Sequence, residues 1–178
     1  THRPIDAALA LREEHGIKAD AIERVEVIFP RFDYVNRPQP QTGLDGKFSV
    51  QYATLIALID GEITIDSFTN ERRFAPDVAA LLPKVRLTVD DAIPSDFDRM
   101  HAIVNVWLQD GRQLSMRVDK LSGWIGSPLT REQRLRKFFG CTRRVLDDAK
   151  AQRMLALVEE LDTLADVTEI MDIARCER

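Results

Sequence analysis

A β-hairpin signal near the middle of the chain places the strongest constraint on its fold. Residues 102–108 read AIVNVWL and residues 114–118 read LSMRV, with Asp110-Gly111 between them. Both segments are rich in residues that favour strands, and Asp-Gly is a preferred turn between two antiparallel strands. Alternating side chains then point to opposite faces of the sheet. The pattern predicts a hairpin with one buried face, which other parts of the chain have to cover.

Further strands and helices complete this prediction. Residues 85–89, VRLTV, alternate between apolar and polar, and residues 25–29, VEVIF, end at Pro30, which cannot donate within a sheet. Apolar residues recur at helical spacing in residues 5–15, ahead of Gly16. We therefore predict an α+β fold, with a mainly antiparallel sheet and helices packed on one face, followed by C-terminal helices.

The most hydrophobic predicted helix lies near residues 48–59 and ends at Asp60-Gly61. Its apolar residues fall at the spacing of one helix face, and they are Phe48, Tyr52, Leu55, Ile56 and Ile59. Tyr52 is expected in the core because it shares this face. Two prolines in residues 37–43, RPQPQTG, exclude regular structure and predict a loop before the helix.

The apolar spacing becomes helical again from Thr130 to the end of the chain. We predict a domain boundary here, with an α+β domain at residues 1–129 and a helical segment at residues 130–178. Cys141 is expected as a small core residue rather than a nucleophile. A run of basic residues is more typical of a solvated helix face than of an anion site. These residues are Arg131, Arg134, Arg136, Lys137, Arg143 and Arg144.

Composition and motifs exclude several classes of function. The 25 basic and 29 acidic residues give a net charge of −4, which argues against nucleic acid as a partner. The three histidines are isolated and the two cysteines are far apart, so we expect no metal site and no disulfide framework. Nucleophile-elbow, dinucleotide and P-loop motifs are absent from the sequence, which removes the local evidence for these three kinds of site.

Hydropathy predicts a protein without a membrane partner. No apolar run approaches the roughly 20 residues that span a bilayer, and the sequence shows no signal-peptide pattern, so we expect a cytoplasmic location. The sequence begins within a helical pattern and without methionine. We expect it to be the internal part of a longer polypeptide.

Three segments together resemble the MmgE/PrpD family. THRPIDAA at residues 1–8 is similar to its motif THxxIDA, and KFSVQYA at residues 47–53, with LIDG behind it, is similar to KFSxxYxxAxALxDG. SPLT at residues 127–130, followed by Lys137-Phe138, resembles NPLTxxxLxxKF. The segments occur in the family's order and extend over most of the chain.

This resemblance implies a function. The family contains cofactor-independent enzymes that act on small polycarboxylates, among them 2-methylcitrate dehydratases, cis-aconitate decarboxylases and iminodisuccinate epimerases. They are homodimers that pair a large helical domain with a smaller α+β lid. The resemblance implies that this chain is the lid with the C-terminal helices, and that it is inactive alone because most catalytic lysines and histidines lie in the missing upstream helical domain.

A fourth segment favours one of these reactions. YVNRP at residues 34–38 resembles a segment of cis-aconitate decarboxylases, in which the tyrosine faces the active site. Dehydration and epimerisation stay open, as does a non-catalytic binding or dimerisation module with the same fold.

The chemistry of a polycarboxylate selects the candidate residues. Such a substrate needs cations and hydroxyl donors, and a proton donor where a carbanion or enediolate is quenched. We predict Tyr34 and His2 as catalytic residues. Arg37, Asn36 and Lys47 are the predicted substrate-binding residues. The structural alternatives are a Tyr34 ring packed at a strand end, a helix-capping His2, and solvated side chains for Arg37 and Lys47.

Overall fold

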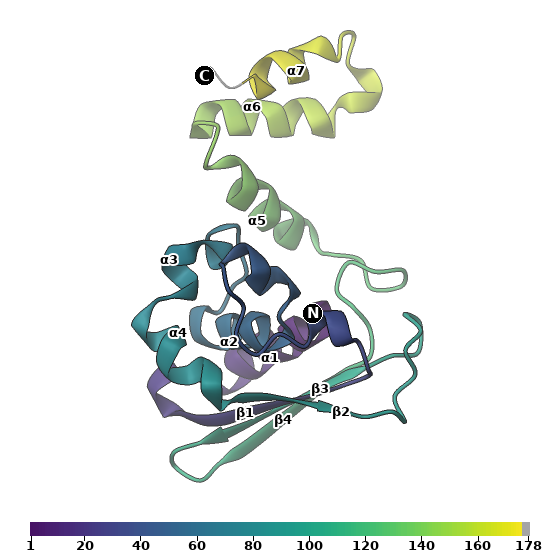
Figure 1. The fold of residues 1–178 in the computed structure, drawn as a ribbon. Helices are drawn as coiled ribbons and strands as arrows, with labels where there is room; N and C mark the ends of the chain where they lie inside the picture. Colours follow the sequence, from purple (N-terminus) through teal and green to yellow (C-terminus); the bar gives the residue numbers. More distant parts are fainter. Residues whose placement is uncertain (176–178) are drawn as a thin grey trace. The chain divides into compact units, whose positions relative to one another are not determined.

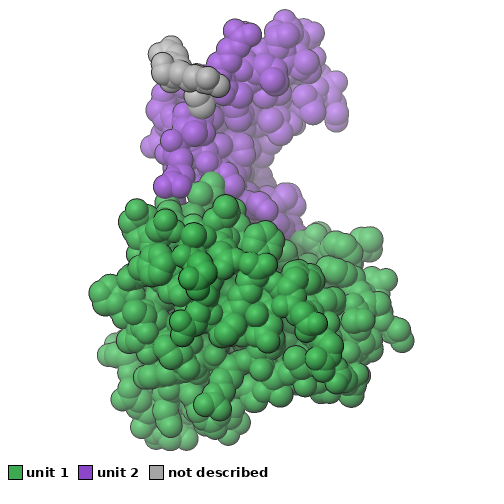
Figure 2. Space-filling view, viewed as in Figure 1, with its two compact units in different colours: residues 1–128 green, residues 129–178 purple. Residues whose placement is uncertain are grey.

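The computed structural model describes residues 1–175. They form two compact units, Thr1–Pro128 and a second unit that begins at Leu129 (Figure 2). In the first unit helices cover one face of a four-stranded sheet (Figure 1), and this confirms the predicted α+β class. The strands are β1 (Ile22–Phe29), β2 (Val85–Val89), β3 (Ala102–Leu108) and β4 (Gln113–Val118).

The sheet has the order β2-β1-β3-β4 and is mixed. β3 pairs antiparallel with both β1 and β4, which agrees with the mainly antiparallel prediction, whereas β1 and β2 are parallel. A parallel pair requires a long crossover connection, and residues 30–84 provide it. The predicted hairpin joins β3 to β4, and Gly111 in its turn has a φ of 88°, a conformation that glycine adopts without strain.

Two helices cover the buried face of the sheet. α1 (His2–His15) contacts β3 and β4, α2 (Val50–Asp60) contacts β1 and β2, and the two helices pack on each other. α1 ends at Gly16, which adopts the left-handed conformation expected of a helix C-cap. The crossover also contains α3 (Asn70–Arg73) and α4 (Pro76–Leu81). Short 3₁₀ turns lie at Ala19–Ala21, Asp33–Val35, Leu44–Phe48, Asp66–Phe68 and Leu82–Lys84.

The outer face of the sheet carries a row of hydrogen-bonded polar side chains, one from each strand. Thr88 donates to Glu26 over 2.7 Å, Asn105 donates to Glu26 over 3.1 Å, and Ser115 donates to the Asn105 Oδ1 over 2.7 Å. The bonds from Thr88 and Asn105 lower the pKa of the Glu26 carboxyl. We call these four residues the polar belt.

Helix α2 is buried on all sides rather than along one face, because every residue from Val50 to Ile59 is buried. Phe48 lies before the helix and is exposed, so its predicted place on the apolar face was wrong. Both ends of α2 have side-chain partners. Ser49 accepts from the Tyr52 amide, and Arg12 of α1 donates to the carbonyls of Leu58 and Ile59 over 2.5 and 2.8 Å.

Tyr52 lies in the core, as predicted. Its side chain is fully buried, and its hydroxyl donates to the Ser67 carbonyl over 2.6 Å. Burial raises the pKa of Tyr52 from its ordinary value of 10 to about 12. The phenolate is disfavoured because ionisation in the core would lose hydration.

The second unit consists of α5 (Arg131–Thr142), α6 (Asp148–Glu159) and α7 (Thr168–Ala174). Thr130 and Gln133 form a capping box at the start of α5. Cys141 is exposed, so the prediction of a core residue was wrong. No helix within residues 1–175 has both the length and the apolar character of a membrane span.

The raised pKa of Tyr52 predicts a loss of stability at alkaline pH. Tyr52 ionises near pH 10 in the unfolded chain and near pH 12 in the folded chain, so its contribution to stability is complete below pH 10 and declines toward pH 12. Tyr52→Phe is expected to lower the free energy of unfolding by about 1 kcal/mol at pH 8. Urea titrations should show the difference from wild type shrinking between pH 10 and 12. A constant difference over this range would contradict the assignment.

Candidate functional site

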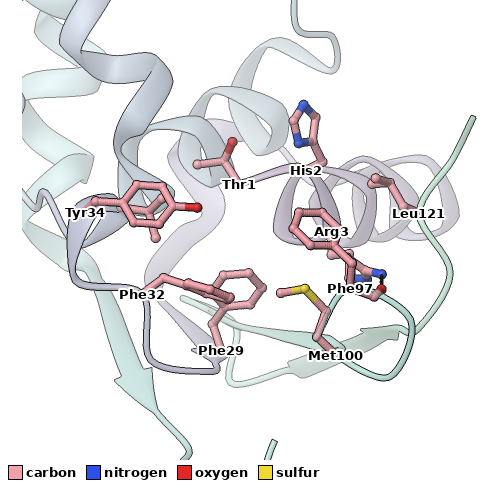
Figure 3. Close-up of a pocket in the computed structure, with 10 residues that line it drawn as sticks. Thr1, His2, Arg3, Phe29, Phe32, Tyr34, Phe97, Met100 and Leu121 are labelled. Carbon is pink, nitrogen blue, oxygen red and sulfur yellow. Dashed lines mark hydrogen bonds between the residues drawn. The ribbon is translucent and has the colours of Figure 1, made fainter. Parts of the chain in front are cut away.

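A pocket lies where the first turn of α1 meets the end of β1, the 3₁₀ turn after it and the connection between β2 and β3 (Figure 3). Its cavity volume is about 40 Å³. The residues that line it are Thr1, His2, Arg3, Phe29, Phe32, Tyr34, Val35, Phe97, Met100 and Leu121. Two of the predicted site residues, His2 and Tyr34, are therefore brought to the same pocket.

The ring of Tyr34 packs against Phe32, which packs in turn against Phe29. Phe32 contacts Tyr34 edge-on with 5.9 Å between ring centroids, and Phe29 at the end of β1 contacts Phe32 at 5.8 Å. Tyr34 itself is 62% exposed, and Figure 3 shows its hydroxyl turned toward the interior of the pocket. This combination places a polar donor at the edge of an apolar cavity.

His2 is the first residue of α1, and its side chain is exposed at the rim of the pocket. Thr1 is the N-cap residue of this helix, and its side chain makes no capping hydrogen bond. Both residues line the pocket because the helix starts there. In either of its predicted roles, capping or catalysis, His2 would therefore act from the first turn of α1 at the rim of the pocket.

Arg3 is a pocket residue that the sequence reasoning missed. It is only 4% exposed, and its guanidinium donates to the carbonyls of Asp119 and Phe97 over 3.1 and 2.5 Å. An arginine in the first turn of a helix is ordinarily solvated. In the sequence, the one sign that Arg3 belongs to the pocket was its position next to His2 in the segment THRPIDAA.

The predicted substrate-binding residue Arg37 is not among the residues that line the pocket. Its guanidinium pairs with Asp45 and also donates to the Tyr34 carbonyl over 2.9 Å. The Gln41 amide, together with Arg37, lowers the pKa of the Asp45 carboxyl. Arg37 thus bridges the turn that carries Tyr34 to the following loop, and its role in binding stays a prediction.

Asn36 and Lys47 also lie away from the pocket lining. The Asn36 side-chain oxygen accepts from the amide of Gln51 over 2.7 Å. Gln51 is 2% exposed in α2, and its own side-chain oxygen has no hydrogen-bond partner among residues 1–175. The Lys47 amine lies 5.6 Å from the centroid of the Phe68 ring. Substrate contacts by these two residues stay predictions.

The loop after Arg37 is fixed at its far end by Gly43. A Cβ at this position would lie 2.2 Å from the Thr69 carbonyl oxygen, so only glycine fits. The Gly43 amide also donates to the Asn70 side chain over 2.9 Å. The loop after Arg37 is therefore packed against the start of α3.

The size and chemistry of the pocket limit what it can hold. A site that holds one water molecule has roughly 10–15 Å³ of space for the centre of that molecule, so the cavity of about 40 Å³ has room for a small group such as one carboxylate. The apolar side chains at its floor lower the local dielectric. A charged group bound there would therefore interact strongly with the polar groups at the rim. Residues 1–175 contain no cluster of three or more His, Cys, Asp or Glu side chains that suits a metal ion.

The bond between Asn36 and Gln51 predicts a specific loss of stability. Asn36→Ala would remove the acceptor of a buried amide, and we expect it to lower the free energy of unfolding by roughly 1–3 kcal/mol. Asn36→Asp keeps an acceptor oxygen at the same position and should stay closer to wild type. Urea denaturation of the three proteins measures the difference. Equal losses for both variants would show that the hydrogen bond does not support the loop.

Comparison with known proteins identifies relatives over nearly all of the chain. The family model of the MmgE/PrpD C-terminal domain matches residues 1–163. Cis-aconitate decarboxylase of Mus musculus is 33% identical over 172 residues, which cover 93% of this chain and 35% of that protein. The Homo sapiens protein of the same name is 30% identical over 181 residues, covering 98% of this chain and 37% of that protein.

A more distant relative has the same name. Cis-aconitate decarboxylase of Aspergillus terreus is 24% identical over 146 residues, which cover 80% of this chain and 30% of that protein. The chain thus spans about a third of the length of the curated relatives that it matches. The match to the family model confirms the resemblance drawn from the motifs: the chain belongs to the MmgE/PrpD family and corresponds to its C-terminal domain.

Proposed function

We propose that this chain is the lid portion of a cofactor-independent lyase that acts on small polycarboxylates, with cis-aconitate as substrate and loss of CO2 as the reaction. The relatives named as cis-aconitate decarboxylases support this choice over dehydration or epimerisation. In the proposal His2 and Tyr34 belong to the active site, and the cytoplasmic enzyme is a homodimer.

The reaction assigns a role to the residues at the pocket. Loss of CO2 breaks a carbon–carbon bond and leaves an electron pair on the substrate, so a proton has to be delivered to carbon. The Tyr34 hydroxyl, turned into the pocket, is the proposed donor. His2 at the same rim is the second candidate for proton transfer. The pocket would hold one carboxylate arm of the substrate during this step.

One observation carries the proposal. His2 and Tyr34 come from two separate segments that resemble family motifs, and the fold brings both to a single cavity. A 62% exposed Tyr34 also argues against the packing alternative.

Exposed apolar side chains on the first unit support the lid role. Several large apolar side chains are exposed on the first unit, and such side chains mark surfaces that are covered in an assembly. They include Tyr34, Phe48, Phe97, Trp124 and Ile125. The proposed cover is a helical domain upstream in the polypeptide, which would supply the rest of the substrate site.

Tyr34→Phe in the complete polypeptide is expected to reduce turnover of cis-aconitate at least about tenfold, because loss of a positioned proton donor costs roughly 10²–10⁴ in rate. The fold should persist, since the exposed ring is retained. Tyr52→Phe is the matched control, with the same chemical change in the core and an expected loss of stability instead of turnover. Steady-state release of CO2 and thermal unfolding of both variants provide the measurements. Unchanged turnover of Tyr34→Phe would remove it from the catalytic residues.

The 178-residue chain is expected to fold but to show no turnover of cis-aconitate or 2-methylcitrate. Its pocket has room for a small group such as one carboxylate, and the proposal places further catalytic residues upstream. A direct assay of the isolated chain, beside the complete polypeptide at equal concentration, tests this. Turnover by the chain alone would overturn the division of the site, and no turnover by either protein would favour a non-catalytic module.

A further inference from the structure

Arg3 is a buried cation whose hydrogen-bond partners are backbone carbonyls. Its Nε donates to Asp119 over 3.1 Å and one Nη donates to Phe97 over 2.5 Å. The carboxylate of Asp119 is not the acceptor, because it pairs instead with Arg117 at 2.6 Å. Hydrogen bonds from a charged donor are stronger than neutral ones, so burial of Arg3 ties it firmly to these two positions.

These two bonds connect three separate segments at the pocket. Arg3 belongs to the first turn of α1, Phe97 lies between β2 and β3, and Asp119 follows β4. The Arg3 guanidinium thereby joins the helix turn that carries the rim residue His2 to the segment that carries the wall residue Phe97. Leu121, two residues after Asp119, lines the same pocket.

The Phe97 side chain also lies beside the Arg3 guanidinium. It is 52% exposed, and its aromatic neighbour is Trp124, at 5.7 Å between ring centroids. The Arg3 guanidinium lies 5.8 Å from the centroid of the Phe97 ring, within the range of a cation–π contact. A planar guanidinium can reach two carbonyls and a ring at once, which the amine of lysine cannot do equally well.

A second contact holds the segment after β4 to the same helix. The Ser122 amide donates to the Asp6 carboxylate over 2.9 Å. Asp6 lies one helical turn after Arg3, so both anchors act from the start of α1. The wall formed by residues 97–100 is held to this helix by the Arg3 guanidinium.

We propose that Arg3 is a positioning residue that fixes the Phe97 wall against α1 and so keeps the pocket at the size of one carboxylate group. The inference rests on the proposed function, because it assigns the cavity to an arm of a polycarboxylate. Arg3 acts through Phe97 and the segment after β4, and it needs no contact with the substrate to do so.

Hydrogen exchange of the 178-residue chain tests the positioning. The Met100 amide, bonded to the Asp96 carbonyl over 2.9 Å, reports on the wall, and the Ser122 amide reports on the segment after β4. In Arg3→Met both amides should exchange at least about tenfold faster, because local opening no longer breaks a charge-assisted bond. The amides of Val104 and Val106 in β3 should keep their wild-type rates. Arg3→Lys should restore part of the protection.

Arg117→Gln is the matched control, because it removes one cation beside Asp119 and leaves the bonds of Arg3 in place. It should leave the exchange rate of Met100 unchanged. Wild-type rates at Met100 and Ser122 in Arg3→Met would overturn the proposal. Equal acceleration of these amides and of those in β3 would also overturn it, because Arg3 would then contribute to global stability alone.

Binding of tricarballylate, a saturated tricarboxylate, tests whether fixing the Phe97 wall affects what the pocket binds. Titration followed through the Tyr34 ring resonances should give a Kd about tenfold weaker for Arg3→Met than for wild type, since a loosened wall has to be ordered on binding. Arg117→Gln should bind like wild type. Faster exchange with an unchanged Kd would sink the proposal. If wild type binds no tricarballylate, the assignment of the cavity to a carboxylate arm fails, and the exchange rates still decide whether Arg3 holds the wall.

Discussion

The burial of α2 on every side is the constraint on which the rest of the first unit depends. A helix that has no solvent-facing side needs neighbours all around it, and each polar group at its ends needs a partner within the protein. The sheet and α1 cover part of its surface, and the crossover covers the remainder. Arg12 meets this requirement at the C-terminal carbonyls, and Ser49 meets it at the N-terminal amides.

The same constraint determines where Tyr34 lies. Gln51 and Ser49 at the start of α2 bond to the Asn36 side chain and to the Arg37 carbonyl. The loop that follows the turn with Tyr34 is therefore anchored to the buried start of α2. An anchor in the packed core restricts where a neighbouring side chain can lie. In this protein Asn36 and Arg37 help to hold Tyr34 in position, and they do not line its pocket.

Local patterns predicted the elements well, and long-range packing accounts for what they missed. Alternation predicted β2, β3 and β4, and Asp110-Gly111 predicted the turn between the last two strands. The parallel pair of β1 and β2 was not specified in advance, because the path of the crossover depends on how α2 packs. Phe48 was misplaced because helical spacing continues across the 3₁₀ turn ahead of the helix. Arg3 was missed because its carbonyl partners are distant in sequence.

The polar belt on the open face of the sheet has an evolutionary consequence. Glu26 accepts from two neighbours, and Asn105 both donates and accepts, so the side chains in the row depend on one another. Replacement of Glu26 by an apolar residue would leave the hydroxyl of Thr88 and the amide of Asn105 without their acceptor. Substitutions at positions 26, 88, 105 and 115 should therefore covary among homologous domains, with whole sets of compatible residues exchanged together.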